Sequence, residues 1–288
     1  MVTSQNNKTI LFCLLVLGLV VLLAAVGPHY SAYDQKATSG EQFSPPSSAH
    51  WFGTDVHGRD LLTRVLSGAR ISLLVGATGA LVSLVVGVLY GLISGYAGGW
   101  LDNLMMRFVE ILYSLPRLIV VIVLISLFDQ QAKTWMQHHG LAAWVPESRL
   151  LLLFAGLGLV EWLTMARVVR GQVLSLRERA FVQAARSMGQ TPALILLKHL
   201  LPNLLPLILV YLTLTVPSVI LEESFLSFLG LGVQAPYASW GTLLSDGAEM
   251  INPLQIHWWL LLAPASFMAL TLLAFNFLGD ALRDRIGR

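Results

Sequence analysis

The uncharged stretch ISLLVGATGALVSLVVGVLYGLISGYAGGWL, from Ile71 to Leu101, decides the fold class of this chain. A helix that crosses a bilayer needs about 20 mostly apolar residues, and this stretch is longer than that. Five further apolar stretches lie at 10–27, 108–128, 150–173, 199–221 and 250–279. Of these, only 108–128 and 150–173 contain charged residues. We therefore predict an all-α, polytopic membrane protein with about six transmembrane helices.

The composition supports a membrane protein and excludes several other classes. Hydrophobic residues make up 56% of the chain, charged residues 12%, and the mean hydropathy is +0.70. Soluble domains carry about 25% charged residues, so a soluble or disordered protein is excluded. A net charge of +2 is too small for a nucleic-acid partner. Cys13 is the only cysteine, so the chain forms no internal disulfide and no cysteine metal cluster.

The first apolar stretch has two interpretations. Lys8, the apolar run and the small residues at 24–27 resemble a cleavable signal peptide. However, the run is long for the apolar region of a signal peptide, and five more spans follow it. We expect an uncleaved transmembrane helix at 10–27.

Basic residues predict the orientation, because cytoplasmic loops of membrane proteins are enriched in Lys and Arg. If both termini are cytoplasmic, the inner side holds Lys8, Arg283 and a basic cluster between 167 and 198. The outer side then holds fewer basic residues, among them Lys36 and Arg149. We therefore expect 1–9 and 281–288 to be cytoplasmic tails of a multi-pass protein.

The outer segment 28–70 has a loop-like first part and an apolar second part. Between Asp60 and Arg70, apolar side chains recur on one helical face. We expect an amphipathic helix on the outer membrane surface there, leading into the second span. In that span small residues recur at every fourth position, which allows close packing of another helix within this chain or in a partner subunit; they are Gly79, Ser83, Gly87, Gly91, Gly95 and Gly99.

No motif of nucleotide hydrolysis or hydrolytic catalysis occurs. The chain has no phosphate-binding loop with Gly-Lys-Ser/Thr, no His-Glu-x-x-His and no Gly-x-Ser-x-Gly. His138 and His139 are adjacent, and we interpret them as solvated loop residues. We predict a protein that is not itself an enzyme and that holds no metal or cofactor.

The longest predicted cytoplasmic connection, 174–203, is the most informative segment. The stretch from Leu176 to Met188 lacks Gly and Pro and predicts a short helix. Gly189 then provides a helix stop, and Thr191 followed by Pro192 predicts the start of a second helix. The expected structure is a helix, a tight turn and a helix at the cytoplasmic face.

This segment resembles the "EAA" loop of ABC importer permeases. Gln183-Ala184-Ala185, three residues, Gly189, nine residues and then His199-Leu200-Leu201-Pro202 follow the pattern Glu-Ala-Ala, three residues, Gly, nine residues, Ile-x-Leu-Pro. The chain departs from this pattern with Gln183 in place of Glu and His199 in place of Ile. A neutral Gln183 cannot form a salt bridge that a glutamate would form.

The resemblance covers most of the chain from 52 to 285 and is specific to the peptide and nickel importer branch. It is closest to the second, "C", permease subunit of oligopeptide importers. The motifs that carry it are Phe52-Gly53-Thr54-Asp55, Gly58-Arg59-Asp60-Leu61-Leu62, Gly68-Ala69-Arg70-Ile71-Ser72-Leu73, Gly95-Tyr96, Gly98-Gly99, Met106-Arg107, Ala166-Arg167, Val169-Arg170-Gly171, the run from Glu223 to Gly232, Trp240-Gly241, Asn276-Phe277 and Gly279-Asp280.

The resemblance implies a type I, MetI-like permease fold, with 71–280 as the permease core, in the cell inner membrane. It implies a second, homologous permease subunit, two ATP-binding subunits that hydrolyse ATP, an extracytoplasmic substrate-binding protein and a peptide substrate. The helix before Gly189 would dock on one ATPase and transmit its closure to the membrane helices. Gln183, Ala184, Ala185 and Gly189 would form this coupling site.

Several charged residues keep two interpretations. Arg177, Arg179 and Arg186 either meet an acidic ATPase surface or anchor the cytoplasmic side. Intramembrane charges are functional candidates, so Glu161 is a candidate for the translocation path. Arg107 and Glu110 either contact the path or pair with each other at the inner interface.

Glu222 and Glu223 follow a uniformly apolar stretch, and Glu223 occupies the acidic position of the family. Both either bond locally at the helix end or line the outer mouth of the path. Two other functions stay open from the sequence: dipeptide or nickel import, and, from another class, a self-sufficient channel, a secondary carrier or a structural scaffold. The 174–203 loop disfavours the latter group, because none of them needs an ATPase-docking segment.

Overall fold

The computed structural model describes residues 2–31, 33–34, 37–145, 147–235, 237–251 and 255–286. Within these ranges the chain forms helices and loops and no β-strand, only an isolated bridge between Thr54 and Asp60. The all-α prediction is confirmed. The elements are α1 (Val2–Tyr30), α2 (Leu61–Val82), the π-helix η1 (Ser83–Gly87), α3 (Val88–Ala97), α4 (Gly99–Ser114), α5 (Arg117–His138), the short 3₁₀ helix η2 (Ala142–Trp144), α6 (Ser148–Leu176), α7 (Ala180–Ser187), α8 (Pro192–Ile195), the π-helix η3 (Leu196–Leu200), α9 (Leu201–Phe228), α10 (Trp240–Glu249) and α11 (Trp259–Ile286).

Six helical segments of the described chain are long and apolar enough to cross a membrane. Each overlaps one of the six predicted stretches, so the predicted number of spans is confirmed. They are Asn6–Tyr30, Leu61–Ala97, Arg117–His138, Ser148–Leu176, Pro192–Phe228 and Trp259–Arg285.

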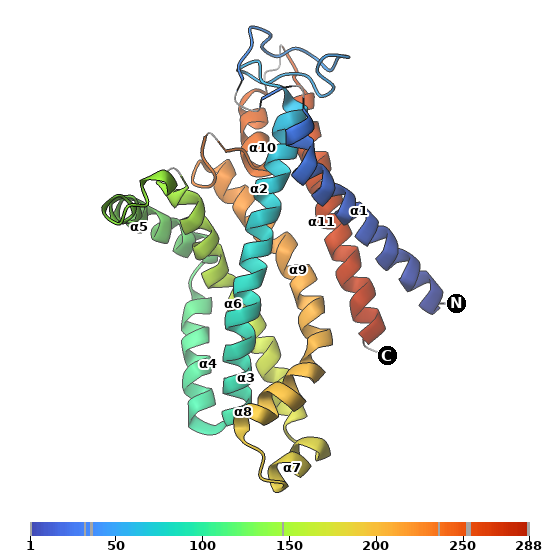
Figure 1. Cartoon of the computed structure of the whole chain (residues 1–288), viewed down its shortest axis with the longest axis vertical. Helices are drawn as coiled ribbons and strands as arrows, with labels where there is room; N and C mark the ends of the chain where they lie inside the picture. Colours follow the sequence, from blue (N-terminus) through green and yellow to red (C-terminus); the bar gives the residue numbers. More distant parts are fainter. Residues whose placement is uncertain are drawn as a thin grey trace.

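The loops gather at two ends of the helix bundle (Figure 1). The loop before α2 and helix α10 lie at one end, and α7 lies at the other. Helices α1 and α11 pack side by side through Cys13, Leu17, Ala274 and Leu278, and both termini point toward the α7 end. Lys36 and Arg288, which enter the charge count that predicts the orientation, lie outside the described residues.

The second span begins ten residues earlier than predicted. Asp60 caps α2 by accepting a hydrogen bond from the Thr63 N–H at 2.9 Å, and the helix continues without a break through Val82. The helix expected at 60–70 is thus present and leads into the second span as predicted, but it does not lie on the surface with its apolar face toward the membrane. Its apolar face packs into the protein, where Trp240 of α10 donates its indole N–H to the Val65 carbonyl at 3.2 Å.

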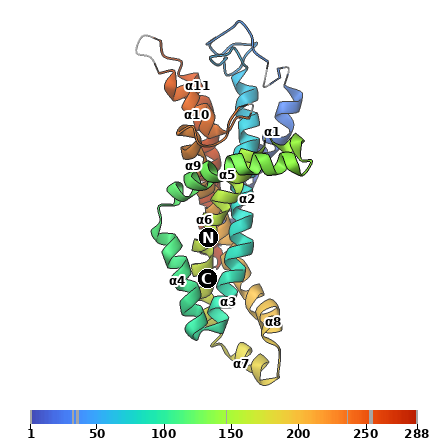
Figure 2. The same ribbon diagram turned by 90° about the vertical axis from the view of Figure 1, so that its left-hand side faces the viewer.

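The third predicted span, 108–128, is not one straight helix. Leu115 is extended, with φ −80° and ψ 136°, because the residue before a proline disfavours the helical region. Pro116 then starts α5. Helix α4 runs along the bundle, whereas α5 runs across it (Figure 2).

The small-residue stripe of the second span packs within this chain from Gly79 to Gly95, which is the first of its two interpretations. A Cβ atom placed on Gly91 would lie 2.5 Å from the Ala166 carbonyl oxygen of α6, so only glycine permits this approach. Ser83 donates a hydrogen bond to the Glu161 carbonyl at 3.2 Å, also on α6. Backbones in close contact in this way hold membrane helices together.

Candidate functional site

Helix α7 is fixed to the membrane helices by one narrow face. Val182 and Ala185 are fully buried, and they pack with Val173 of α6, Ile195 of α8 and Leu200 of η3. The rest of α7 is exposed. The short helix therefore cannot move independently of α6 and α9, which is the property that a lever requires.

The predicted helix of the 174–203 loop is shorter than expected. α6 extends to Leu176, and the extended backbone of Arg179, with φ −74° and ψ 147°, separates it from α7. The predicted helix from Leu176 to Met188 therefore begins only at Ala180. The second helix starts at Pro192 as predicted and runs without interruption into α9.

Gly189 forms the tight turn. Its φ of +74° lies in the left-handed region that favours glycine. The Gly189 N–H donates to the Arg186 carbonyl at 2.9 Å, and the Gln190 N–H donates to the Ala185 carbonyl at 3.1 Å. These two bonds form a Schellman motif, which satisfies the last carbonyls of α7.

The other residues assigned to the coupling site surround this turn. Gln183 donates from its side chain to the Glu178 carbonyl at 3.1 Å, and Ala184 is exposed. Arg186 lies over the Tyr96 ring at 5.0 Å. Arg179 is exposed. The exposed surface around Gln183, Ala184 and Met188 is thus presented outward on a rigid support.

Arg177, which is also assigned to the coupling site, has contacts within this chain. Its guanidinium donates to the Gly95 carbonyl at 3.0 Å and to the Glu178 carboxylate at 3.1 Å. These bonds connect the end of α6 to the end of α3. These contacts within the chain agree with a structural role for Arg177, and its contact with an acidic ATPase surface stays a prediction.

His199 has a local partner that explains the departure from the family pattern. Its Nε2 lies 2.8 Å from the Gln190 side-chain oxygen. The imidazole thus connects η3 to the residue after the Gly189 turn. An isoleucine at this position would have no such bond.

A charged cluster lies within the membrane helices, at the beginning of α5. The Arg117 guanidinium lies 3.2 Å from the Glu161 carboxylate of α6 and 3.6 Å from the Glu222 carboxylate of α9. The Glu161 side chain is almost completely buried, whereas the Arg117 side chain is 33% exposed. Two of the three residues assigned to the translocation path, Glu161 and Glu222, are therefore brought together by an arginine that the sequence analysis did not select.

Polar side chains extend the cluster toward the α7 end. Arg117 also donates to the Tyr113 hydroxyl at 2.8 Å and to the Thr164 hydroxyl at 3.4 Å. Arg167 lies over the Tyr113 ring at 4.0 Å. Charged and hydrogen-bonding groups at this depth are costly in lipid, so such groups face a water-filled cavity or other protein.

Glu223, the third residue assigned to the path, does not join this cluster. Its side chain is fully buried, accepts a hydrogen bond from Ser227 at 2.6 Å and lies 3.5 Å from the Ser72 and Ser224 hydroxyls. Of its two interpretations, local hydrogen bonding is the one for which this structure shows contacts. Glu223 connects α9 to α2.

A second ion pair holds α4 against α6. Asp102 of α4 accepts two bonds from Arg170 of α6, at 2.6 and 2.7 Å, and Ser94 of α3 also donates to Asp102. In contrast, Arg107 and Glu110 are exposed, and neither has an ion-pair partner within 4.0 Å in the described chain. Their predicted pairing with each other is absent from this structure.

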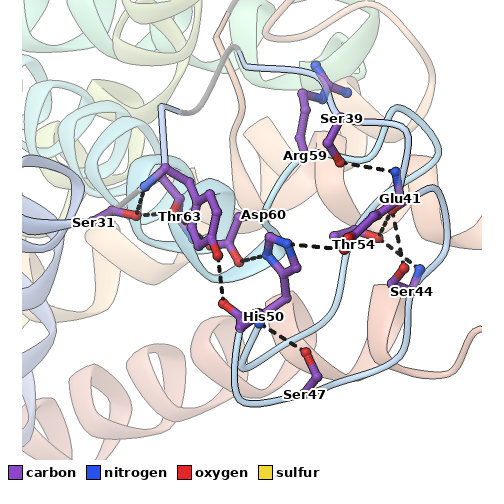
Figure 3. Close-up of polar contacts among 12 residues, drawn as sticks. Ser31, Ser39, Glu41, Ser44, Ser47, His50, Thr54, Arg59, Asp60 and Thr63 are labelled. Carbon is purple, nitrogen blue, oxygen red and sulfur yellow. Dashed lines mark hydrogen bonds and ion pairs between the residues drawn. The ribbon is translucent and has the colours of Figure 1, made fainter.

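At the other end of the molecule, residues 37–60 form a compact loop structure, which is named the outer cap after the predicted position of 28–70. Thr54 accepts a bond from the Ser44 N–H at 2.8 Å, and His50 lies 2.9 Å from Asp60. Figure 3 shows how these side chains converge. Gly53 and Gly58, with φ of +77° and +71°, adopt the left-handed conformation that favours glycine.

Asp55 joins the outer cap to α2 and α10. It accepts bonds from Arg59 at 2.8 Å and from Arg64 at 2.7 Å, and Arg64 also reaches Asp246 of α10 at 3.3 Å. Burial alone would raise the pKa of Asp55. The hydrogen bond from the Arg59 N–H and the charge of Arg64 outweigh it, and they lower this pKa below its usual value.

The residues that sequence analysis missed share one property. Arg117 and Tyr113 contact each other four residues apart, but their partners on α6, and the Arg170 partner of Asp102, lie more than 40 residues away in the sequence, so local spacing does not reveal them. Their polar character inside or next to apolar stretches was the available signal. For Arg117 the sequence offered a second signal. A proline disfavours the helical conformation of the residue before it, so Pro116 ends one helix and Arg117 begins another.

Six candidate membrane spans, two helices that meet at Pro116 beside a charged cluster, and a helix-turn-helix packed against the membrane helices at one end define a multi-pass membrane protein. The family model for the binding-protein-dependent transport system inner membrane component matches residues 87–288. The chain belongs to this family, and it is the permease of a binding-protein-dependent ABC importer.

Similar proteins cover nearly the whole chain. The oligopeptide transport system permease protein OppC of Escherichia coli K12 is 47% identical over 98% of this chain and 87% of its own length. OppC of Haemophilus influenzae is 45% identical over 98% and 85%. The dipeptide transport system permease protein DppC of Bacillus subtilis is 44% identical over 98% and 82%.

Among solved structures, a chain of the MetNI methionine ABC transporter in an inward-facing conformation has a similar fold. The TM-score is 0.54 at 22% identity, over 79% of this chain and 96% of the other. This similarity concerns the fold alone. It confirms the predicted MetI-like permease fold.

Proposed function

We propose that this chain is one of two permease subunits of an importer for oligopeptides. The relatives named for oligopeptide transport support this cargo, and the relative named for dipeptide transport favours dipeptides as the second candidate. A self-sufficient channel or carrier is not retained, because the family consists of components of binding-protein-dependent systems.

The observation that carries the proposal is the rigid mounting of α7. Val182 and Ala185 hold this helix to α6 and to the start of α9, while Gln183 and Ala184 are exposed. An ATPase that binds this exposed surface would therefore move α6 and α9 directly. The partners hydrolyse ATP, and this chain provides the lever and half of the path.

The remaining assignments follow from this arrangement. Two ATP-binding subunits dock at the α7 end, which is cytoplasmic together with both termini. A second permease completes the path in the inner membrane. The binding protein delivers the peptide at the end formed by the outer cap and α10.

Affinity purification of the tagged chain in mild detergent, with mass spectrometry of the co-purifying proteins, tests this proposal. We expect a second permease, one or two ATPases and a peptide-binding protein. Ala184→Trp should block ATPase docking but retain the second permease, because residue 184 is exposed beside the turn. Ala143→Trp, exposed at the opposite end, is the matched control. A wild-type chain that purifies without any ATPase in several detergents would contradict the proposal.

A further inference from the structure

The charged cluster between α5, α6 and α9 places two carboxyl groups against one guanidinium group. Glu161 and Glu222 both contact the same guanidinium nitrogen of Arg117, at 3.2 and 3.6 Å. No second Lys or Arg of the described chain lies within 4.0 Å of either carboxylate, and Arg167 is held elsewhere. It lies over the Tyr113 ring and forms no ion pair within 4.0 Å.

One carboxylate oxygen of the cluster has no partner. The Glu222 Oε2 atom is buried and accepts no hydrogen bond among the described residues. A buried acceptor without a donor is costly, and an excess carboxylate within a membrane protein more so. The cluster therefore favours one additional cationic group that donates hydrogen bonds.

The cluster is also reachable. The side chains of Arg117 and Glu222 are 33% and 18% exposed, whereas Glu161 behind them is 5% exposed. Leu115 and Pro116 break the helix directly before Arg117, so α4 does not continue across this point. A group that approaches from the exposed side meets Glu222 and Arg117 first.

We propose that Glu222, together with Glu161, forms a transient binding site for the ammonium group of a peptide during translocation. This inference rests on the proposed peptide import, and it identifies the group of the cargo that the membrane path recognises. An ammonium carries one positive charge and three hydrogen-bond donors. It thus provides both the charge and the donor that Glu222 Oε2 lacks, and Arg117 keeps the two carboxylates together when the site is empty of cargo.

Uptake by the reconstituted complex tests the site with two peptides of the same sequence, one with a free amino terminus and one N-acetylated. Both are delivered by the same binding protein, so its preference cancels when variant and wild type are compared. We expect Glu222→Gln to lower the maximal uptake rate of the free-amine peptide about ten-fold and to leave that of the acetylated peptide nearly unchanged. Equal losses for both peptides, or no loss, would overturn the inference.

Glu223→Gln is the matched control, because its carboxylate is enclosed by serines one residue away. We expect it to change the uptake of both peptides by the same factor. If neither peptide enters the wild-type vesicles, the proposed function fails rather than this site.

A direct measurement makes the test independent of uptake rates. A peptide with a photoreactive group in its first residue is irradiated with the wild-type complex during ATP turnover, and the labelled residues are mapped by mass spectrometry. We expect labels on α5, α6 and α9 near Glu222, reduced at least five-fold by N-acetylation of the peptide. Labels elsewhere, no labels, or labels insensitive to acetylation would overturn the proposal.

Discussion

The 174–203 loop and the charged cluster of α5, α6 and α9 are built in opposite ways. In the loop, each essential feature comes from residues that are close in sequence: the Gly189 turn binds Arg186, and Gln190 binds Ala185. In the cluster, Arg117 meets residues 44 and 105 positions later. The first region is a local structure that another protein can recognise, whereas the second exists only after the helices have packed.

This difference predicts where substitutions act. A change in the loop should alter coupling to the partner while the membrane bundle remains folded. A change in the cluster should alter the packing of α5 as well as transport.

The largest effect is expected at the Gly189 turn. Gly189→Trp places a bulky residue at φ +74°, where L residues with side chains are strained, so the Schellman motif is lost and α7 is misplaced. We expect uptake to be abolished at normal membrane insertion. Gly189→Asn is the matched control, because asparagine tolerates this conformation, and it should retain most of the uptake.

Normal uptake by the Gly189→Trp protein at wild-type expression would contradict the coupling assignment. Loss of the protein from the membrane would instead show that the turn is needed for folding. Measuring uptake, membrane content and ATPase retention on the same samples separates these outcomes.

The next effect is expected in the cluster. Arg117→Gln removes the cation that holds Glu161 and Glu222, and two buried carboxylates then face each other. Breaking a buried ion pair costs roughly 3–5 kcal/mol, and the partial exposure of Arg117 reduces this to about 2 kcal/mol. Thermal unfolding of the detergent-solubilised protein should show a lower transition temperature.

The double variant Arg117→Gln/Glu161→Gln tests the cause of that loss. It removes one of the two unpaired carboxylates, so it should recover at least half of the lost stability. A double variant that is less stable than Arg117→Gln would show that the packing of the arginine side chain, and not its charge, matters here.

The same contrast explains what could be predicted from the sequence. The six spans are visible because hydrophobicity accumulates along a helix, and the Gly189 turn is visible because its residue types are local signals. The helix break at Pro116 is also a local signal. Because the residues on both sides of it are apolar, the sequence predicts one span at 108–128 and does not show the change in helix direction between α4 and α5. The enclosure of Glu223 could not be predicted, because Ser72 lies on another helix and only the packed structure brings the two together.

The smallest effect is expected for Gln183→Glu, which introduces the glutamate of the family pattern. Glutamate cannot donate to the Glu178 carbonyl as Gln183 does at 3.1 Å, which should cost less than about 1 kcal/mol at this exposed site. Arg179 lies four positions earlier, at the N-cap of α7, and would offset less than about 0.5 kcal/mol of that cost. We therefore expect uptake and ATPase retention within about two-fold of wild type, measured with the purified complex. The contrary outcome is a variant that loses the ATPase completely while it retains the second permease. That outcome would show that the docking surface of the partner has adapted to a neutral residue. The loop would then share the fold of the family but differ from it in its interface.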